Sequence, residues 1–185
     1  MFKQSIVENF KDIKDSALAN VRDAALEFVI AVLIFLSVYN GVFRTAIISG
    51  ESMEPTFSDS QRCVVWVSAY WFKEPKRGDV IVFPSPGDKK SKYIKRVAAK
   101  SGDEVDFKNG AFYVNGEKLK NGETSFIGSY SLPLIVPDDT VFALGDNIDA
   151  SRDSRDSSVG CIAQQDIVGK VVFRFWPFKK AGVIN

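Results

Sequence analysis

The feature that most constrains this chain is an apolar run near its N-terminus, residues 28–43 (FVIAVLIFLSVYNGVF). Eleven of these sixteen residues are Leu, Ile, Val or Phe. Together with residues 24–26 they form an apolar stretch of about 20 residues, which is the length that an α-helix needs to cross the hydrocarbon core of a bilayer. Glu27 interrupts this stretch near the membrane boundary, where a carboxylate can reach the headgroups. We therefore expect a transmembrane helix over residues 25–43.

Two alternatives to a membrane anchor follow from the same run. A cleaved signal peptide is disfavoured, because 27 residues precede the run and no Ala-x-Ala cleavage site follows it. A buried core helix stays open as an alternative, since the uninterrupted apolar part, residues 28–39, is short.

The distribution of Lys and Arg around the run predicts its orientation. Four positive charges precede the run, at Lys3, Lys11, Lys14 and Arg22, whereas Arg44 alone follows it within the next fifteen residues. Flanks that are rich in Lys and Arg stay in the cytoplasm. We therefore expect a single membrane pass with a cytoplasmic N-terminus, and the chain after residue 44 outside the membrane.

The first 24 residues carry a helical pattern of their own. Their apolar residues recur at steps of three and four, which places them on one face of a helix: Phe2, Ile6, Phe10, Ile13, Ala17, Val21 and Ala24. Charged residues occupy the other face. Residues 1–24 are therefore predicted to form a cytoplasmic amphipathic segment that lies along the membrane or against a partner helix.

From residue 44 the pattern changes to short strands separated by turns. Runs of β-branched and aromatic residues, bounded by Gly, Pro, Asp and Lys, recur at residues 64–67, 79–83, 93–98 and 171–175. Asn-Gly pairs near residues 109 and 115 are typical of hairpin turns, and a third pair, Asn121-Gly122, follows shortly after them. We expect a mainly β, extracytoplasmic domain over residues 44–185, with a hairpin-rich insertion at roughly 102–137.

The absence of histidine limits the chemistry that this chain can perform. Ser-His-Asp and Cys-His catalysis, HExxH metal sites and His-containing zinc fingers are excluded, so an acid or base must be a Lys, carboxylate, Tyr or Cys with a shifted pKa.

Cys63 and Cys161 form no CxxC motif; they could form one disulfide outside the cytosol, but two buried hydrophobic side chains are favoured. The net charge of +1 gives no indication of a nucleic-acid partner.

The turn at residues 49–56 (SGESMEPT) holds a candidate nucleophile. Gly50 permits unusual backbone angles, and Ser52 in such a turn could present its hydroxyl and its own N–H to a bound carbonyl. A capped surface turn has the same composition and remains the alternative.

Two further segments could complete a site. In a strand, Lys95 shares one face with Tyr93 and Val97. Burial of that face would lower the lysine pKa toward neutrality and yield a general base, whereas a lysine that extends into solvent is the alternative. The loop at residues 145–155 (GDNIDASRDSR) is either a solvated loop or a source of hydroxyls that orient a neutral lysine and of an Asp/Arg pair that braces the loop.

Four segments, in the order SGESMEPT (49–56), RGDVIVF (77–83), YIKRV (93–97) and GDNIDASRDSR (145–155), resemble the type I signal peptidases. The resemblance covers roughly residues 28–176. It implies a membrane-anchored Ser-Lys endopeptidase, in a bacterial-type plasma membrane, that removes signal peptides from exported preproteins at sites with small residues at −1 and −3. It also implies a β-rich catalytic core with a small inserted cap, signal peptides and the lipid bilayer as partners, and neither a metal nor another cofactor.

The resemblance gives each matching residue a role. Ser52 is implied as the nucleophile and Lys95 as the general base, with Ser151 hydrogen-bonded to the lysine amine. Asp153 and Arg155 are implied to support the site. The residues that match the substrate pockets are Ile48, Met53, Val82, Tyr93 and Ile94.

This sequence departs from the family pattern at three places, one of which is Ile148, where the residue after Gly-Asp-Asn is usually an arginine. Gly50 stands where Gram-negative-type members often have a serine, which leaves the oxyanion hole to backbone N–H groups. The repeat SRDSRDSS also allows a frame with Ser154 and Asp156, but the spacing from Asn147 favours Ser151. Two other functions fit much of the sequence: a specialised Ser-Lys peptidase for a conjugation or pilin substrate, and an inactive module that binds signal peptides.

Overall fold

The computed structural model describes residues 2–125, 128–129 and 131–184, without the side chains of residues 2–17, 19, 38, 40, 89 and 121. The chain divides into two compact units, Met1–Gly41 and Val42–Asn185.

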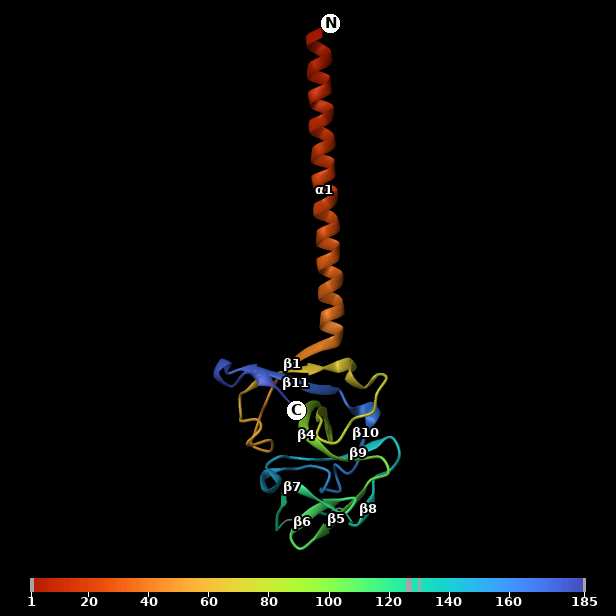
Figure 1. Ribbon diagram of the computed structural model, residues 1–185, viewed down its shortest axis with the longest axis vertical. Coiled ribbons are helices and arrows are strands. Elements are labelled where there is room, and N and C mark those ends of the chain that lie inside the picture. The colour runs from red at the N-terminus through yellow and green to blue at the C-terminus, as the bar shows by residue number, and fades with distance from the viewer. Residues whose placement is uncertain (1, 126–127, 130, 185) are drawn as a thin grey trace. The chain divides into compact units, whose positions relative to one another are not determined.

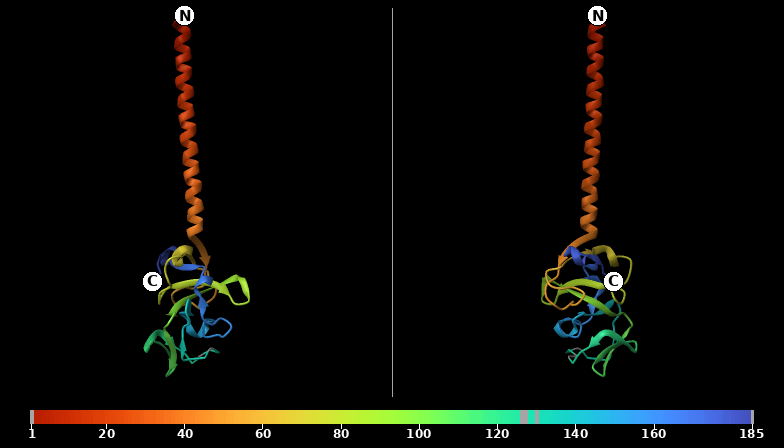
Figure 2. Two further views of the ribbon diagram at one scale, coloured as in Figure 1. Left: turned by 90° about the vertical axis from the view of Figure 1, so that its right-hand side faces the viewer. Right: turned by 60° about the vertical axis from the view of Figure 1, so that its left-hand side comes forward.

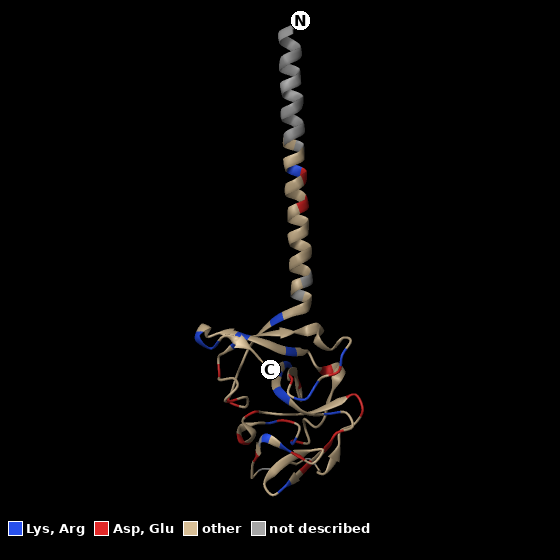
Figure 3. Ribbon diagram, in the orientation of Figure 1, with Lys and Arg blue, Asp and Glu red and all other residues tan. Residues whose placement is uncertain are grey.

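The first unit consists of one α-helix, α1 (Phe2–Val42) (Figure 1). The amphipathic segment and the apolar run, which the sequence predicts as separate elements, are continuous because residues 1–40 contain neither Gly nor Pro to break a helix. No charged residue lies between Glu27 and the end of the helix, and Figure 3 draws this part without blue or red. Between Leu26 and Leu36 the large apolar side chains are 38–70% exposed.

Two predictions for this unit stay predictions. Most of the predicted apolar stripe of residues 1–24 falls on residues 2–17, whose side chains lie outside the described residues. In the part of the chain that the structure describes, no helix has the length and apolar content needed to cross a membrane. The transmembrane helix expected over residues 25–43 is therefore not confirmed.

The described residues of the second unit form two antiparallel sheets, the larger with eight strands. These strands are β1 (Phe43–Ile47), β2 (Arg62–Trp66), β3 (Val80–Ser85), β4 (Asp88–Lys100), β9 (Thr140–Leu144), β10 (Ile162–Ala163), β11 (Gly169–Trp176) and β12 (Gly182–Val183). Their order is β1-β2-β11-β3-β4-β9-β10, and β12 pairs with β11. The late strand β11 thus lies between β2 and β3 and connects the strands that flank the candidate site.

The smaller sheet has four strands: β5 (Glu104–Lys108), β6 (Ala111–Val114), β7 (Glu117–Glu123) and β8 (Leu134–Ile135). Asn109 and Asn115 begin its hairpin turns with φ of 51° and 52°, and each is followed by a glycine with positive φ, as expected for Asn-Gly turns. The sheet gathers at one end of the β unit in all views (Figures 1 and 2). The prediction of a mainly β fold with a β-rich core is confirmed.

The part of this unit that the structure describes also contains four short 3₁₀ helices: η1 (Val67–Tyr70), η2 (Ile148–Ala150), η3 (Gln164–Asp166) and η4 (Phe178–Lys180). Cys63 is fully buried, and burial raises the pKa of its thiol to about 11. Both cysteines are described, and no disulfide joins Cys63 to Cys161. The interpretation of the two cysteines as buried hydrophobic side chains agrees with the position of Cys63, whereas Cys161 is only half-buried.

Three hydrophobic clusters hold the β unit together, and β4 takes part in all of them. Ile94 packs against the first cluster, Ala98 belongs to the second and Val97 to the third. Because successive side chains of a strand point to opposite faces, β4 is packed on both sides. A functional side chain on β4 therefore sits on a rigid support.

Candidate active site

Ser52 lies in the loop of residues 48–61, which connects β1 to β2. The Ile48 N–H donates to the Gln61 carbonyl (2.8 Å), and the Ser60 N–H donates to the Ile48 carbonyl (2.9 Å). These two bonds continue the β1–β2 pairing and close the base of the loop.

The turn around Ser52 is fixed by a hydrogen bond on its exposed side and by packing on its buried side. Gly50 has φ of 87°, a left-handed conformation that favours glycine, and its N–H donates to Asp59 Oδ1 (2.9 Å). Met53 and Phe57 are fully buried in the first hydrophobic cluster. The backbone on both sides of the serine is therefore fixed.

Lys95 reaches Ser52 from the middle of β4, where it pairs with Ile81 of β3. Its side chain is buried, and Nζ donates a hydrogen bond of 2.7 Å to Ser52 Oγ. The amine also lies 5.4 Å from the centre of the Tyr93 ring. The residues predicted as nucleophile and base are thus in direct contact.

The environment of Lys95 favours an uncharged amine. Burial is the largest cause, and it lowers the pKa of Lys95 from its ordinary value of 10.5 to about 8. The positive charge of Arg155 lowers the pKa further, whereas the carboxylates of Asp153 and Asp146 oppose the shift. An amine with this pKa is partly neutral near physiological pH and can accept a proton.

Asp153 and Arg155 form a buried ion pair in the loop that follows β9. The two side chains make bonds of 2.8 and 3.0 Å, and each is about 1% exposed. Arg155 also donates to the carbonyls of Ile148 and Ser151, while Asp153 accepts from the Gly145 N–H (3.0 Å). The pair thus braces both ends of the loop.

This loop contacts the nucleophile segment directly. The Asn147 N–H donates to the Ser52 carbonyl (3.1 Å). A Cβ atom at Gly145 would collide with the Ser151 side chain and with the same carbonyl, so the close approach requires glycine.

The structure does not contain the hydrogen bond expected between Ser151 and Lys95. Among the described residues, Ser151 Oγ is buried and has no hydrogen-bond partner, because the lysine amine is directed to Ser52. In the alternative frame, Ser154 Oγ accepts from the Ala143 N–H and Asp156 pairs with Arg152. Neither of these two residues contacts the lysine in the described bonds.

The sequence did not predict a second set of stabilising hydrogen bonds, which Arg96 on the opposite face of β4 and Arg174 of β11 make. Arg96 makes bonds of 2.8 and 2.9 Å to the Asp146 carboxylate and donates to the Gly78 carbonyl (2.7 Å). Arg174 of β11 donates to the Thr56 carbonyl (2.6 Å) and so ties the nucleophile loop to the sheet. The alternation of side chains along β4 could have indicated that Arg96 lies on the face opposite to Lys95. No local sequence pattern indicates the partner of Arg174.

A pocket of about 260 Å³ opens over Ser52 and Lys95. Four of the predicted substrate-contacting residues line it, namely Ile48, Met53, Tyr93 and Ile94. Val82 is buried in the same hydrophobic cluster as Ile48 but is not among the lining residues. Lys92 and Arg152 also line the pocket, and sequence analysis did not single them out.

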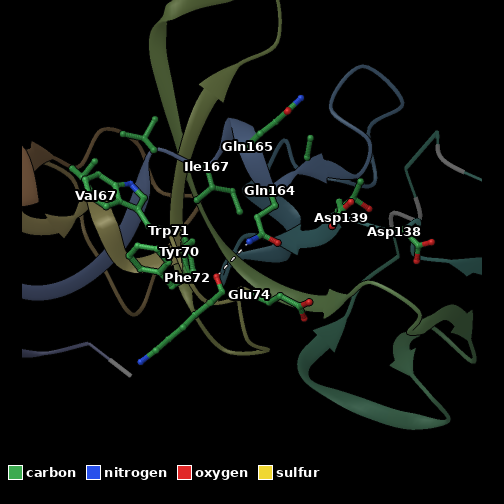
Figure 4. Close-up of a pocket in the computed structure, with 14 residues that line it drawn as sticks. Val67, Tyr70, Trp71, Phe72, Glu74, Asp138, Asp139, Gln164, Gln165 and Ile167 are labelled. Carbon is green, nitrogen blue, oxygen red and sulfur yellow. Dashed lines mark hydrogen bonds between the residues drawn. The ribbon is translucent and has the colours of Figure 1, made fainter.

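A second groove, of about 860 Å³, lies elsewhere on the β unit (Figure 4). Trp71 and Phe72 line one part of it, and Gln164 donates to the Lys73 carbonyl (3.4 Å). None of the predicted site residues contributes to its lining.

The chain has clear similarity to known proteins. Residues 21–176 match the family model described as signal peptidase, peptidase S26. "Signal peptidase I" of Bacillus amyloliquefaciens is 33% identical over 178 residues, which cover 90% of this chain and 94% of the relative. "Signal peptidase IB" of Staphylococcus aureus is 35% identical over 174 residues, with 84% and 89% covered. A solved signal peptidase I from Enterococcus faecalis V583 is 28% identical and covers 53% of this chain and 97% of that chain, with a TM-score of 0.41.

The family model spans most of this chain, and both curated relatives match it over nearly their whole length. The resemblance of the four sequence motifs to signal peptidases is therefore confirmed. The chain belongs to the signal peptidase family, peptidase S26, and is a serine endopeptidase.

Proposed function

We propose that this chain removes N-terminal signal peptides from exported preproteins with a Ser-Lys dyad, in which Ser52 is the nucleophile and Lys95 the general base. The proposal rests on the 2.7 Å hydrogen bond between Lys95 Nζ and Ser52 Oγ. The lowered pKa of the Lys95 amine supports the proposal, because an amine must be uncharged to take the hydroxyl proton.

The reaction is acyl transfer in two steps. The neutral Lys95 amine accepts the Ser52 proton while Oγ bonds to the scissile carbonyl carbon, and backbone N–H groups such as that of Ser52 stabilise the oxyanion. The C–N bond then breaks, and the Lys95 ammonium gives its proton to the leaving amine. In the second step Lys95 takes a proton from water, whose oxygen bonds to the ester carbon. The bond from this carbon to Ser52 Oγ then breaks, and the Lys95 ammonium returns the proton to Ser52 Oγ.

The pocket beside the dyad supports a preference for small residues at −1 and −3 of the substrate. Ile48 and Met53 are almost fully buried, so they cannot move aside for a bulky side chain without disturbing the first hydrophobic cluster. Tyr93 and Ile94 border the same space of about 260 Å³. Ser151, Asp153, Arg155 and Gly50 keep their roles as supporting residues in this proposal.

A membrane anchor over residues 25–43 is part of the proposal. The exposed apolar side chains between Leu26 and Leu36 support it, because a helix that is apolar all round is stable only when it is covered. Val38 and Asn40 of this segment lie outside the described side chains. The excess of Lys and Arg before the run predicts a cytoplasmic N-terminus and an outer catalytic domain. Protease digestion of intact and opened membrane vesicles tests this orientation.

An exposed face of the large sheet, formed by β1, β2, β11 and β12, supports contact of the catalytic domain with the outer surface of the plasma membrane. Trp176 pairs with Arg62, and Arg62 pairs with Ile47, so these three side chains share one face. Trp66 and Val183 lie on the same face, and the apolar members of this set are 37–71% exposed. Exposed aromatic residues of this kind favour the membrane–water interface.

A cleavage assay tests the proposed function. The full chain, purified in detergent, is mixed with a preprotein that carries an Ala-x-Ala site, and the product is identified by N-terminal sequencing. Ser52→Ala and Lys95→Ala are expected to lose at least about a thousandfold in kcat/KM, whereas the surface variants Ser101→Ala and Lys120→Ala keep the parent rate.

Three outcomes would contradict the proposal. Cleavage by either dyad variant at the parent rate would reject the Ser-Lys assignment. Binding of the preprotein without cleavage by the parent would favour an inactive signal-peptide-binding module. Cleavage of a pilin-type substrate alone would favour a specialised processing peptidase.

A further inference from the structure

Two cations border the pocket that contains Ser52 and Lys95. Lys92 lies at the start of β4 and is exposed, and within the described residues its ammonium has no ion-pair partner. Arg152 lines the wall formed by the loop after β9. Its side chain is 56% exposed and pairs at the surface with Asp156 (3.0 Å).

The carboxylates nearest to the reacting groups do not neutralise this rim. Asp146 is paired with Arg96, and Asp153 with Arg155. Glu51 is the one carboxylate among the residues that line the pocket as the structure describes it. The neighbouring hairpin segment, residues 88–92 (DKKSK), holds three lysines and one aspartate. Among the described lining residues, Lys92, Lys95 and Arg152 outnumber Glu51. Because Arg152 is paired with Asp156 and Lys95 is buried against Ser52, Lys92 is the exposed cation that an acidic group can meet.

The spacing of β4 sets the reach of Lys92. A strand advances about 3.3 Å per residue, so the Lys92 Cα lies about 10 Å along β4 from that of Lys95. A substrate in extended conformation advances by a similar distance per residue. Lys92 shares a face of β4 with Ile94, opposite to Lys95, and all three residues line the pocket. An acidic side chain within about four residues of the scissile bond can therefore meet Lys92, while Arg152 lines the same pocket from the loop after β9.

We propose that Lys92, assisted by Arg152, selects substrates that carry an acidic side chain within about four residues of the scissile bond. The inference rests on the proposed function, because it requires the pocket to hold the peptide that is cleaved. Exposed charge pairs are weak and are screened by salt. The preference is therefore modest, about two- to fivefold in kcat/KM for each acidic residue, and largest at low ionic strength.

The test measures kcat/KM of the full chain in phosphatidylcholine vesicles on a set of matched peptides. All peptides share a neutral parent sequence with Ala at −1 and −3, and each carries Glu, Gln or Lys at one position within four residues of the cleavage site. The parent enzyme is expected to prefer Glu to Lys at one position or more and to lose the preference at 0.5 M salt. Lys92→Glu is expected to invert the preference there, Lys92→Gln to abolish it and Arg152→Gln to weaken it.

Lys120→Glu is the matched control, since it changes an exposed lysine of the smaller sheet by the same charge. It is expected to keep the parent preference. Equal constants for Glu, Gln and Lys peptides, or an unchanged preference in Lys92→Glu, would overturn this inference and leave the proposed function intact. An effect of Lys92→Glu that appears only in anionic vesicles, and equally for all peptides, would instead assign Lys92 to lipid headgroups. Failure of the parent enzyme to cleave any peptide would contradict the proposed function itself.

Discussion

Lys95 Nζ and Ser52 Oγ are 2.7 Å apart although the two residues are separated by 43 positions in the sequence. The strand that carries Lys95, β4, is not a neighbour of the strands that flank the loop of Ser52, β1 and β2. β2, which ends the nucleophile loop, pairs with β11, then β11 pairs with β3 and β3 with β4. The contact between the two side chains therefore depends on a strand from the C-terminal end of the chain.

The pH dependence of cleavage should follow the lysine amine. With a pKa of about 8, roughly a tenth of the amine is neutral at pH 7 and about nine tenths at pH 9. We expect kcat/KM to rise about tenfold per pH unit below pH 7 and to level off above pH 9, in a profile measured with a peptide that does not titrate in this range. A profile that is flat from pH 6 to 10 would exclude Lys95 as the base.

Replacing Lys95 should stabilise the fold while it removes activity. Burial holds the pKa of Lys95 in the folded chain at about 8, below its ordinary 10.5, so the unfolded chain binds more protons between these values. The free energy of unfolding of the parent should rise with pH over this window, and below pH 8 the buried charge costs on the order of 3 kcal/mol.

Lys95→Met removes this cost and should be more stable than the parent at pH 7, with a difference that shrinks between pH 8 and 10.5. Urea unfolding at pH 7 and pH 10 measures both quantities. Lys120→Met, at an exposed position, should show no such dependence on pH. A Lys95→Met variant that is less stable than the parent at pH 7 would contradict the burial argument.

Breaking the buried ion pair should be costly. Asp153→Asn leaves the charge of Arg155 uncompensated in the interior, where the loss of one partner typically costs about 3–5 kcal/mol. Asp156→Asn breaks the exposed pair with Arg152 and should cost less than about 1 kcal/mol. Chemical denaturation of the two variants gives the comparison, and equal losses would show that the buried pair does not brace the loop.

Gly145→Ala should damage both the fold and the catalysis. The added methyl group meets Ser151 and the Ser52 carbonyl, and overpacking of this kind costs about 1–3 kcal/mol. Gly182→Ala is the control, because nothing lies within 4 Å of a Cβ at that position. We expect a lower kcat and a lower melting temperature for the first variant only. Parent-like kinetics of Gly145→Ala would mean that the loop can withdraw from Ser52 without consequence.

Ser151→Ala should affect the stability of the fold and the rate of cleavage differently. In the described structure the Ser151 hydroxyl is buried without a hydrogen bond, so its removal should leave the free energy of unfolding unchanged or raise it by about 1 kcal/mol. If the hydroxyl holds the lysine amine during the reaction, kcat should nevertheless fall and the apparent pKa in the pH profile should shift. Unchanged kcat and an unchanged pH profile would remove Ser151 from the site.

The sequence was sufficient where a local pattern carries the structure. Alternation in β4 predicted a face with Lys95 and Val97, and both side chains are buried. The Asn-Gly pairs at 109 and 115 predicted turns because asparagine and glycine tolerate positive φ, whereas the pair Asn121-Gly122 lies within β7. The β-branched and aromatic runs predicted the strands of the large sheet for the same kind of local reason.

Contacts between distant segments could not be read in this way. The pairing of Arg96 with Asp146, 50 positions away, depends on the register of β4 against β9. The orientation of Ser151 depends on the close approach at Gly145, which no spacing rule contains. A single helix, α1, carries both N-terminal segments, because a change in polarity alone does not end a helix.

The pairing of β3 with β4 decides more than the shape of the sheet. Ile81 lies opposite Lys95 and Val80 opposite Arg96, and the two cations point to opposite faces. A slip of one residue would turn every side chain of β4 over and direct a guanidinium, which keeps its proton at any physiological pH, toward the serine. Such a molecule would retain a sheet and its composition yet lack the proton acceptor of the proposed dyad, so correct strand alignment is itself a condition for the proposed reaction.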